Sequence, residues 1–129
     1  MDLALLDSDH PVFPCPSKAL VDPDGLLAVG GNLQPSTLLA AYRQGVFPWY
    51  EDGQPLLWWS PDPRTVIFPN DIKISRSLRK AFNQKKWEIR LDTAFLSVIE
   101  SCAAPRKKSH GDTWITDEMK AGYVALHAK

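Results

Sequence analysis

The apolar positions near the N-terminus form short runs between turn-forming residues. Residues 1–34 are rich in Pro, Gly and Asp around small apolar pieces such as residues 25–29. This pattern predicts irregular coil with short strands and turns. The glycine pair at residues 30–31 predicts a bend that needs unusual backbone angles.

Helical spacing of apolar residues begins at residue 35. Residues 35–45 predict a helix in which Ser36 or Thr37 caps the start and Gly45 provides a left-handed stop. Pro48 lacks a backbone N–H, so the helix does not continue through the following segment.

Strand patterns occur at three places in the middle of the chain. Residues 56–59 and 65–68 are apolar runs separated by a proline-rich turn, and residues 87–91 alternate between apolar and polar side chains. These patterns predict three strands.

Three further helices are predicted between and after these strands. Residues 75–86 form a basic amphipathic pattern with Leu78 and Phe82 facing inward. Residues 92–102 place Cys102 on an apolar face, as a buried and inert thiol. Thr116 opens a last helix, which carries an apolar face at Met119, Tyr123 and Leu126. Strands and helices without strict alternation indicate an α+β fold.

Charge and proline divide the chain near residues 60–64. Residues 1–63 carry two basic and eight acidic residues, a net charge of −6, whereas residues 64–129 carry thirteen basic and seven acidic residues, a net charge of +6. Ten of the eleven prolines lie in residues 11–69. The division predicts an N-terminal domain over residues 1–62 and a second domain from residue 63, although chance segregation on one folded surface gives the same counts.

Composition excludes several classes of protein. The chain of 129 residues is 44% hydrophobic and 23% charged, which excludes a charge-driven disordered chain. The sequence has no run of 18 apolar residues and no signal peptide, and its two Cys provide no disulfide framework. These features predict a cytoplasmic protein with no membrane partner. The three His lack zinc spacing, and the chain carries no phosphate-binding or nucleophile-elbow motif.

An aromatic cluster is the first candidate site. Its members are Phe47, Trp49, Tyr50, Trp58 and Trp59. An indole in a turn can stack a nucleobase. A core strand is the favoured interpretation of Trp58 and Trp59, and Trp49 is left open between stacking and core.

Two basic segments are the other candidates. Arg76, Arg79, Lys80 and Lys86 fall on about one face of the predicted helix, which suits a phosphate backbone as well as a solvated surface. The loop at residues 106–108 precedes Trp114 and could meet a phosphate and then a base, or could simply be a surface loop with a buried tryptophan anchor.

Six segments resemble the leucyl/phenylalanyl-tRNA–protein transferases of bacteria. They are GLLAVGGN at 25–32, LLAAYRQGVFPWY at 38–50, LWWSPDPR at 57–64, ISRS at 74–77, VIESC at 98–102 and TWIT at 113–116. The resemblance implies transfer of Leu or Phe from leucyl-tRNA or phenylalanyl-tRNA to acceptor proteins with N-terminal Arg or Lys, which marks them for degradation by the N-end rule route. It implies a small N-terminal α/β domain before an acetyltransferase (GNAT)-like domain, and a monomer with no cofactor and no metal.

The resemblance also assigns site residues. Trp49 and Trp114 match tryptophans that hold the terminal adenosine of the tRNA, and Tyr42 lies in the same motif and is grouped with them. Basic residues of the helix match a segment that grips the tRNA backbone: Arg76, Arg79, Lys80, Lys85 and Lys86.

The length departs from the family. Members of the family are longer, so we expect this chain to be a truncated piece whose residues 63–129 begin the GNAT-like domain. The catalytic residues are then expected in the missing C-terminal part. The alternatives are a non-catalytic RNA- or nucleotide-binding module and a CoA-dependent acetyltransferase, although the chain lacks the glycine-rich pyrophosphate loop that the latter needs.

Overall fold

The computed structural model describes residues 3–85, 87–105 and 113–129. Contacts group the chain into two compact units. The first unit comprises Met1–Asp62 with Phe95–Lys129, and the second comprises Pro63–Ala94.

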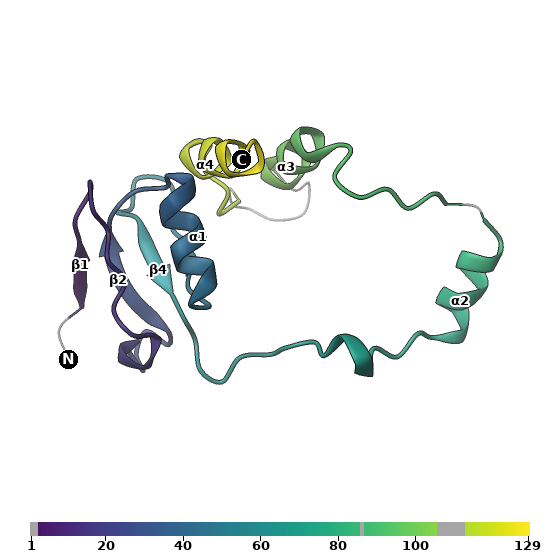
Figure 1. Cartoon of the computed structure of the whole chain (residues 1–129), viewed down its shortest axis with the longest axis horizontal. Coiled ribbons are helices and arrows are strands. Elements are labelled where there is room, and N and C mark those ends of the chain that lie inside the picture. Colours follow the sequence, from purple (N-terminus) through teal and green to yellow (C-terminus); the bar gives the residue numbers. More distant parts are fainter. Residues whose placement is uncertain (1–2, 86, 106–112) are drawn as a thin grey trace. The chain divides into compact units, whose positions relative to one another are not determined.

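The first unit is built on a four-stranded mixed sheet (Figure 1). The strands are β1 (Ala4–Leu6), β2 (Leu26–Gly30), β3 (Phe47–Pro48) and β4 (Leu57–Trp59), in the order β1-β2-β4-β3. The β1–β2 pair is parallel, whereas β4 pairs antiparallel with both β2 and β3. The short 3₁₀ helix η1 (Pro16–Lys18) lies between β1 and β2.

Helix α1 (Pro35–Arg43) covers one face of this sheet (Figure 1). Its Leu38 and Ala41 join a core cluster with side chains of β1, β2 and β4. Trp58 is 0% exposed, meets the ring of Phe13 edge-on at a centroid distance of 4.7 Å, and donates its indole N–H to the Gly30 carbonyl at 2.8 Å. The prediction of a core role for Trp58 is therefore confirmed.

The start of α1 differs from its prediction. The N-cap position is Gln34, and Pro35 occupies the first turn, where its missing N–H is not needed. The Asn32 side chain accepts the Gln34 N–H at 3.0 Å and the Thr37 hydroxyl at 2.7 Å. The prediction of Ser36 or Thr37 as the cap is wrong, because the helix already begins at Pro35 and the Thr37 hydroxyl donates to Asn32.

The predicted glycine positions are confirmed. Gly45 has φ +73°, and Gly30 and Gly31 have φ +88° and +79°. A Cβ on Gly30 would lie 2.9 Å from the Leu6 carbonyl oxygen, so the close β1–β2 approach also requires glycine there.

Helices α3 (Phe95–Ala103) and α4 (Asp117–His127) complete the first unit (Figure 1). Thr116 caps α4 by accepting the Met119 N–H at 3.1 Å, and Met119 is buried, both as predicted. Ile99 is the buried position of α3, whereas Cys102 is exposed. The predicted burial of Cys102 is wrong because only Ile99 of α3 turns fully toward the packed side.

The second unit contains the 3₁₀ helix η2 (Pro69–Asp71) and α2 (Arg76–Asn83). The strands predicted at 65–68 and 87–91 are wrong, since neither segment finds a ladder partner among the described residues. Their apolar side chains are exposed, with Ile67 at 78% and Leu91 at 85%. Leu78 and Phe82 are likewise about half exposed, so α2 shows no buried inner face in this unit.

The described residues confirm an α+β fold of helices with a mixed sheet. No helix within residues 3–85, 87–105 and 113–129 has the length and apolar character needed to cross a bilayer.

Candidate functional site

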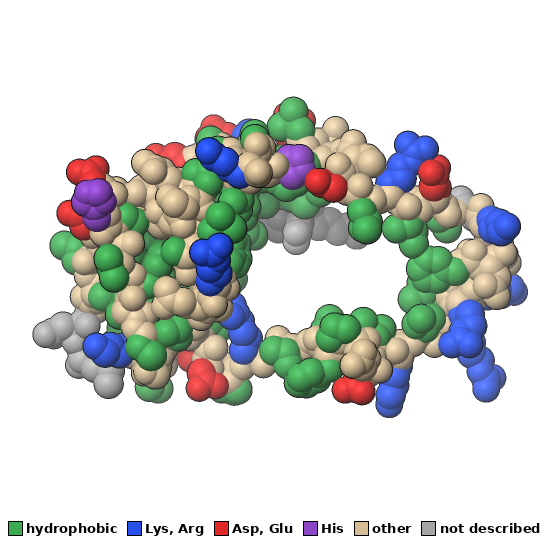
Figure 2. Space-filling model, in the orientation of Figure 1, with side chains coloured by type: hydrophobic (Ala, Val, Ile, Leu, Met, Phe, Trp, Pro, Cys, Tyr) green, Lys and Arg blue, Asp and Glu red, His purple; other side chains and the backbone are tan. Residues whose placement is uncertain are grey.

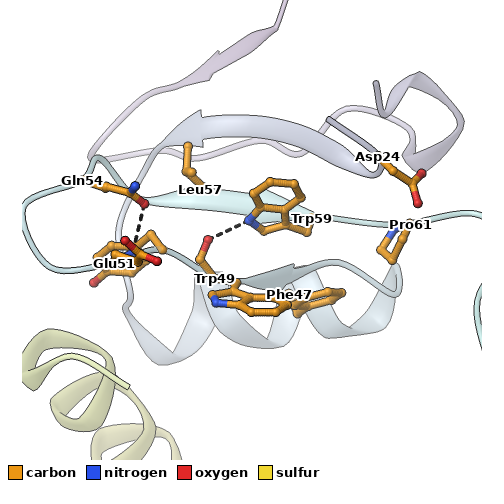
Figure 3. Close-up of a pocket in the computed structure, with 9 residues that line it drawn as sticks. Asp24, Phe47, Trp49, Glu51, Gln54, Leu57, Trp59 and Pro61 are labelled. Atoms are coloured by element: carbon orange, nitrogen blue, oxygen red, sulfur yellow. Dashed lines mark hydrogen bonds between the residues drawn. The ribbon is translucent and has the colours of Figure 1, made fainter. Parts of the chain in front are cut away.

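The β3–β4 hairpin sorts its aromatic residues onto two faces. Alternation buries Pro48 and Tyr50, while Phe47 and Trp49 point to the other face. Trp59, which pairs with Phe47, donates its indole N–H to the Trp49 carbonyl at 2.7 Å (Figure 3). The backbone that carries Trp49 is therefore fixed by the neighbouring strand, although its indole stays 52% exposed.

Trp49 and Trp114 meet in the structure. Their ring centroids are 6.5 Å apart with the planes tilted by 54°, and Trp114 is 41% exposed. Together with Phe47 and Pro48 they line a cavity of about 250 Å³, which we call the indole cleft. At this tilt one indole can stack flat on a planar ligand while the other meets the edge of the ligand. Trp49 and Trp114 are far apart in the sequence, so the spacing of residues gives no sign that they meet. Only the resemblance to the family predicted that both bind the same adenosine.

A hydrogen-bond network joins the two segments that carry these indoles. The Tyr50 hydroxyl donates to Glu118 Oε2 at 3.1 Å and accepts from the Thr116 hydroxyl at 3.2 Å. Tyr50 is only 5% exposed. Burial raises the pKa of Tyr50 above its ordinary value, the Thr116 hydrogen bond opposes that rise, and the hydrogen bond and charge of Glu118 add to it.

Sequence reasoning missed this network. Its only sequence signal is that Tyr50 directly follows Trp49 and that Thr116 lies two residues after Trp114. Nothing in the spacing shows that residues 66 positions apart share a hydrogen bond.

Tyr42 does not line the indole cleft. It lies on α1, where its hydroxyl shares a hydrogen bond with the Tyr123 hydroxyl of α4. Burial is the largest cause that raises the pKa of Tyr123, and the Tyr42 hydrogen bond adds to it. A role of Tyr42 toward adenosine stays a prediction.

The basic residues of α2 are brought together on one short helix. Arg76, Arg79 and Lys80 are exposed, and Ser75 caps their helix by accepting the Leu78 N–H at 3.2 Å. Figure 2 shows the Lys and Arg side chains gathered around this helix. Lys85 follows the helix with φ +51°. Lys86 and the basic loop at 106–108 lie outside the described residues.

A larger cavity lies on the same face of the hairpin as Trp49 (Figure 3). Its volume is about 400 Å³, and aromatic and acidic side chains line it. The lining comprises Asp24, Phe47, Trp49, Tyr50, Glu51, Gln54, Leu57, Trp59 and Pro61. Trp58 and Trp59 therefore lie on a strand with one face in the core, as predicted: Trp58 is buried there, and Trp59 lies on the opposite face and lines this cavity.

The described part of the chain contains no cluster of side chains suited to bind a metal ion. Within residues 3–85, 87–105 and 113–129, no group of three or more His, Cys, Asp or Glu side chains could hold a metal ion. What the site offers is flat apolar surface with hydrogen-bonding groups at its edge, a chemistry that suits a nucleobase.

Comparison with known proteins places two protein-family models on the chain. The model described as "Leucyl/phenylalanyl-tRNA protein transferase N-terminal domain" matches residues 31–62, and the model described as "Leucyl/phenylalanyl-tRNA protein transferase" matches residues 66–129. Together they account for most of the sequence.

Curated proteins of the same description are similar over nearly the whole chain. The leucyl/phenylalanyl-tRNA–protein transferase of Azoarcus sp. (strain BH72) is 58% identical over 120 residues, which are 93% of this chain and 51% of the relative. That of Pseudomonas putida (strain W619) is 55% identical over 127 residues, 98% of this chain and 56% of the relative. That of Nitrosomonas europaea is 55% identical over 122 residues. The chain spans about half the length of the curated relatives it matches.

Proposed function

The chain belongs to the leucyl/phenylalanyl-tRNA–protein transferase family, and on this premise we propose that its indole cleft binds the 3′-terminal adenosine of an aminoacyl-tRNA. The transferred residue is Leu or Phe, and the acceptor is a protein with N-terminal Arg or Lys. The observation that carries this proposal is the approach of Trp49 and Trp114 to a ring-centroid distance of 6.5 Å.

The chemistry of this proposal depends on positioning. An aminoacyl ester is already activated, so a neutral N-terminal amine can attack its carbonyl without a cofactor. Holding the two groups together supplies roughly 7–11 kcal/mol of the barrier. Stacking of the adenine on an indole contributes about 1–3 kcal/mol of binding and holds one end of the substrate.

Helix α2 has a separate role in the proposal. Arg76, Arg79, Lys80 and the following Lys85 are exposed cations that can bind the tRNA backbone, together with Lys86. Residues 63–94 carry eight basic and three acidic residues, a composition that supports contact with phosphate. Such contacts are not specific for sequence and weaken as salt is raised.

Catalysis is assigned to residues beyond these 129. The chain spans about half of its curated relatives, and none of its described side chains is assigned a catalytic role. In this proposal residues 63–129 begin a GNAT-like domain, the domain boundary lies near residue 62, and the enzyme acts as a cytoplasmic monomer that marks proteins for degradation.

A transfer assay tests the function. The 129 residues are joined to the part of the Azoarcus relative that they do not cover, and labelled leucyl-tRNA is offered with a peptide that begins with Arg. We expect transfer to this peptide and none to the same peptide with an acetylated N-terminus. Absence of transfer, when the intact Azoarcus relative is active in the same assay, would overturn the proposal.

The second candidate is an RNA-binding module without transfer activity. Its support is that the described residues hold the indole cleft and the exposed cations of α2, and that none of them is assigned a catalytic role. For the 129-residue chain by itself we expect adenosine binding without transfer. Transfer by this chain alone would exclude the second candidate.

A further inference from the structure

The 400 Å³ cavity adjoins the indole cleft and shares two of its walls. Phe47 and Trp49 line both spaces. Figure 3 shows Phe47 and Trp49 on one side of the larger cavity and Trp59 on the other. Three aromatic rings therefore offer flat apolar surface to a second planar group beside the one held in the cleft.

Glu51 and Gln54 stand together at one end of this cavity (Figure 3). They belong to one turn, in which the Gln54 N–H donates to the Glu51 carbonyl and the Glu51 N–H donates to Gln54 Oε1, both at 3.0 Å. The second bond engages the amide oxygen, so the amide nitrogen is the group that Gln54 offers to a ligand. A carboxylate acceptor and an amide donor thus lie side by side.

The charge of the cavity selects among ligands. Its lining holds the carboxylates of Asp24 and Glu51 and no Lys or Arg. Such a lining repels phosphate and favours a base that carries an amino group. Among base contacts, a carboxylate that accepts from the N4 amino group of cytosine is a standard pairing.

We propose that this cavity binds the cytosine that precedes the terminal adenosine at the 3′ end of tRNA. The inference rests on the proposed function, because the indole cleft must hold that adenosine. Glu51 accepts from the N4 amino group, and the Gln54 amide nitrogen donates to the ring acceptors N3 or O2. Uracil carries an oxygen at position 4, which would face the Glu51 carboxylate unfavourably.

The test compares three ligands on the 129-residue chain. Adenosine, cytidylyl-adenosine and uridylyl-adenosine are titrated, and dissociation constants are taken from calorimetry. We expect cytidylyl-adenosine to bind about tenfold more tightly than either adenosine or uridylyl-adenosine.

Two matched variants assign the effect to the cavity. Glu51→Gln should reduce the preference for cytidylyl-adenosine over uridylyl-adenosine to about twofold, because the amide can also donate to uracil. Its affinity for adenosine should stay unchanged, since Glu51 does not line the indole cleft. Glu100→Gln removes an exposed carboxylate of α3 and should keep the tenfold preference.

The outcomes separate this inference from the proposed function. Adenosine binding with equal affinities for the two dinucleotides would overturn the cytosine site and leave the indole cleft standing. Failure of all three ligands to bind would contradict the proposed function and, with it, the cytosine site.

Discussion

Tyr50 connects the two segments that carry the cleft indoles. It directly follows Trp49, and its hydroxyl bonds Thr116 and Glu118, which begin the helix after Trp114. The separation of the indoles therefore depends on a buried side chain that does not itself line the indole cleft. This dependence gives Tyr50 a positioning role that can be measured apart from stability.

Removing the Tyr50 hydroxyl should loosen the cleft. In Tyr50→Phe the ring stays buried but both hydrogen bonds are lost, so we expect adenosine affinity to fall several-fold and the free energy of unfolding to fall by about 1 kcal/mol. Calorimetric titration and urea unfolding measure the two effects.

Thr37→Val is the matched control for this variant. The Thr37 hydroxyl is also buried and hydrogen-bonded, to Asn32 at 2.7 Å, but it lies away from the cleft. The control should lose similar stability and keep its adenosine affinity. If both variants lose the same affinity, Tyr50 acts through stability alone.

The raised pKa values of two tyrosines predict how the free energy of unfolding depends on pH. Burial raises the pKa of both Tyr50 and Tyr123 above the ordinary value of 10.0. The unfolded chain then releases these protons at lower pH than the folded chain, so the free energy of unfolding should fall as pH rises above about 10.

Urea unfolding between about pH 8 and about pH 11 measures this dependence. The double variant Tyr50→Phe, Tyr123→Phe should lose less stability over that range than the wild type. An equal loss in both proteins would show that these hydroxyls do not cause it.

Among the elements, α2 combines a cationic and an apolar face. Its existence was predictable, because Ser75 provides an N-cap signal and Leu78 and Phe82 have helical spacing. The flanking strands were not, since residues 65–68 and 87–91 have strand-like sequences but no partner among the described residues. Side-chain periodicity predicts a strand only where a second strand is present to pair with it.

Charge reversal on α2 should weaken RNA binding selectively. In Arg76→Glu, Lys80→Glu the affinity for tRNA should fall, and the dependence of its logarithm on the logarithm of salt concentration should flatten by about one unit per residue. Adenosine affinity should stay as in the wild type. Filter binding at several salt concentrations measures the slope.

A double reversal in the first unit is the control. Arg43→Glu, Lys18→Glu changes two exposed cations of that unit by the same total charge. It should alter tRNA affinity less than the α2 variant does. Equal losses in the two double variants would mean that net charge, and not α2, governs binding.

For the whole molecule, the acidic and basic halves of the sequence do not coincide with the two compact units of the structure. The sequence divides near residue 63, whereas contacts group Phe95–Lys129 with Met1–Asp62. This grouping brings Trp114 to Trp49. Local patterns predicted α1, α3 and α4 and a strand at residues 56–59, observed as Leu57–Trp59, because each has its own caps, turns or apolar spacing.

Long-range contacts limited what the sequence could predict about the site. The indole pair followed from resemblance to a family and not from spacing. The Tyr50 network had no sequence signal beyond the position of Tyr50 beside Trp49 and of Thr116 near Trp114. The cavity beside Trp59 had none, because it joins residues from separate turns and strands. The zero net charge of the whole chain gave no indication that residues 63–94 carry an excess of basic side chains.

Adenosine binding by tryptophan variants shows whether the indole cleft is the adenosine site. Calorimetric titration of adenosine compares the wild type with Trp49→Ala, Trp114→Ala and the control Trp87→Ala, whose side chain is exposed in the second unit. We expect each of the first two variants to bind adenosine at least about tenfold more weakly and the control to bind as the wild type does. Equal adenosine affinity in all four proteins would contradict the indole cleft as the adenosine site.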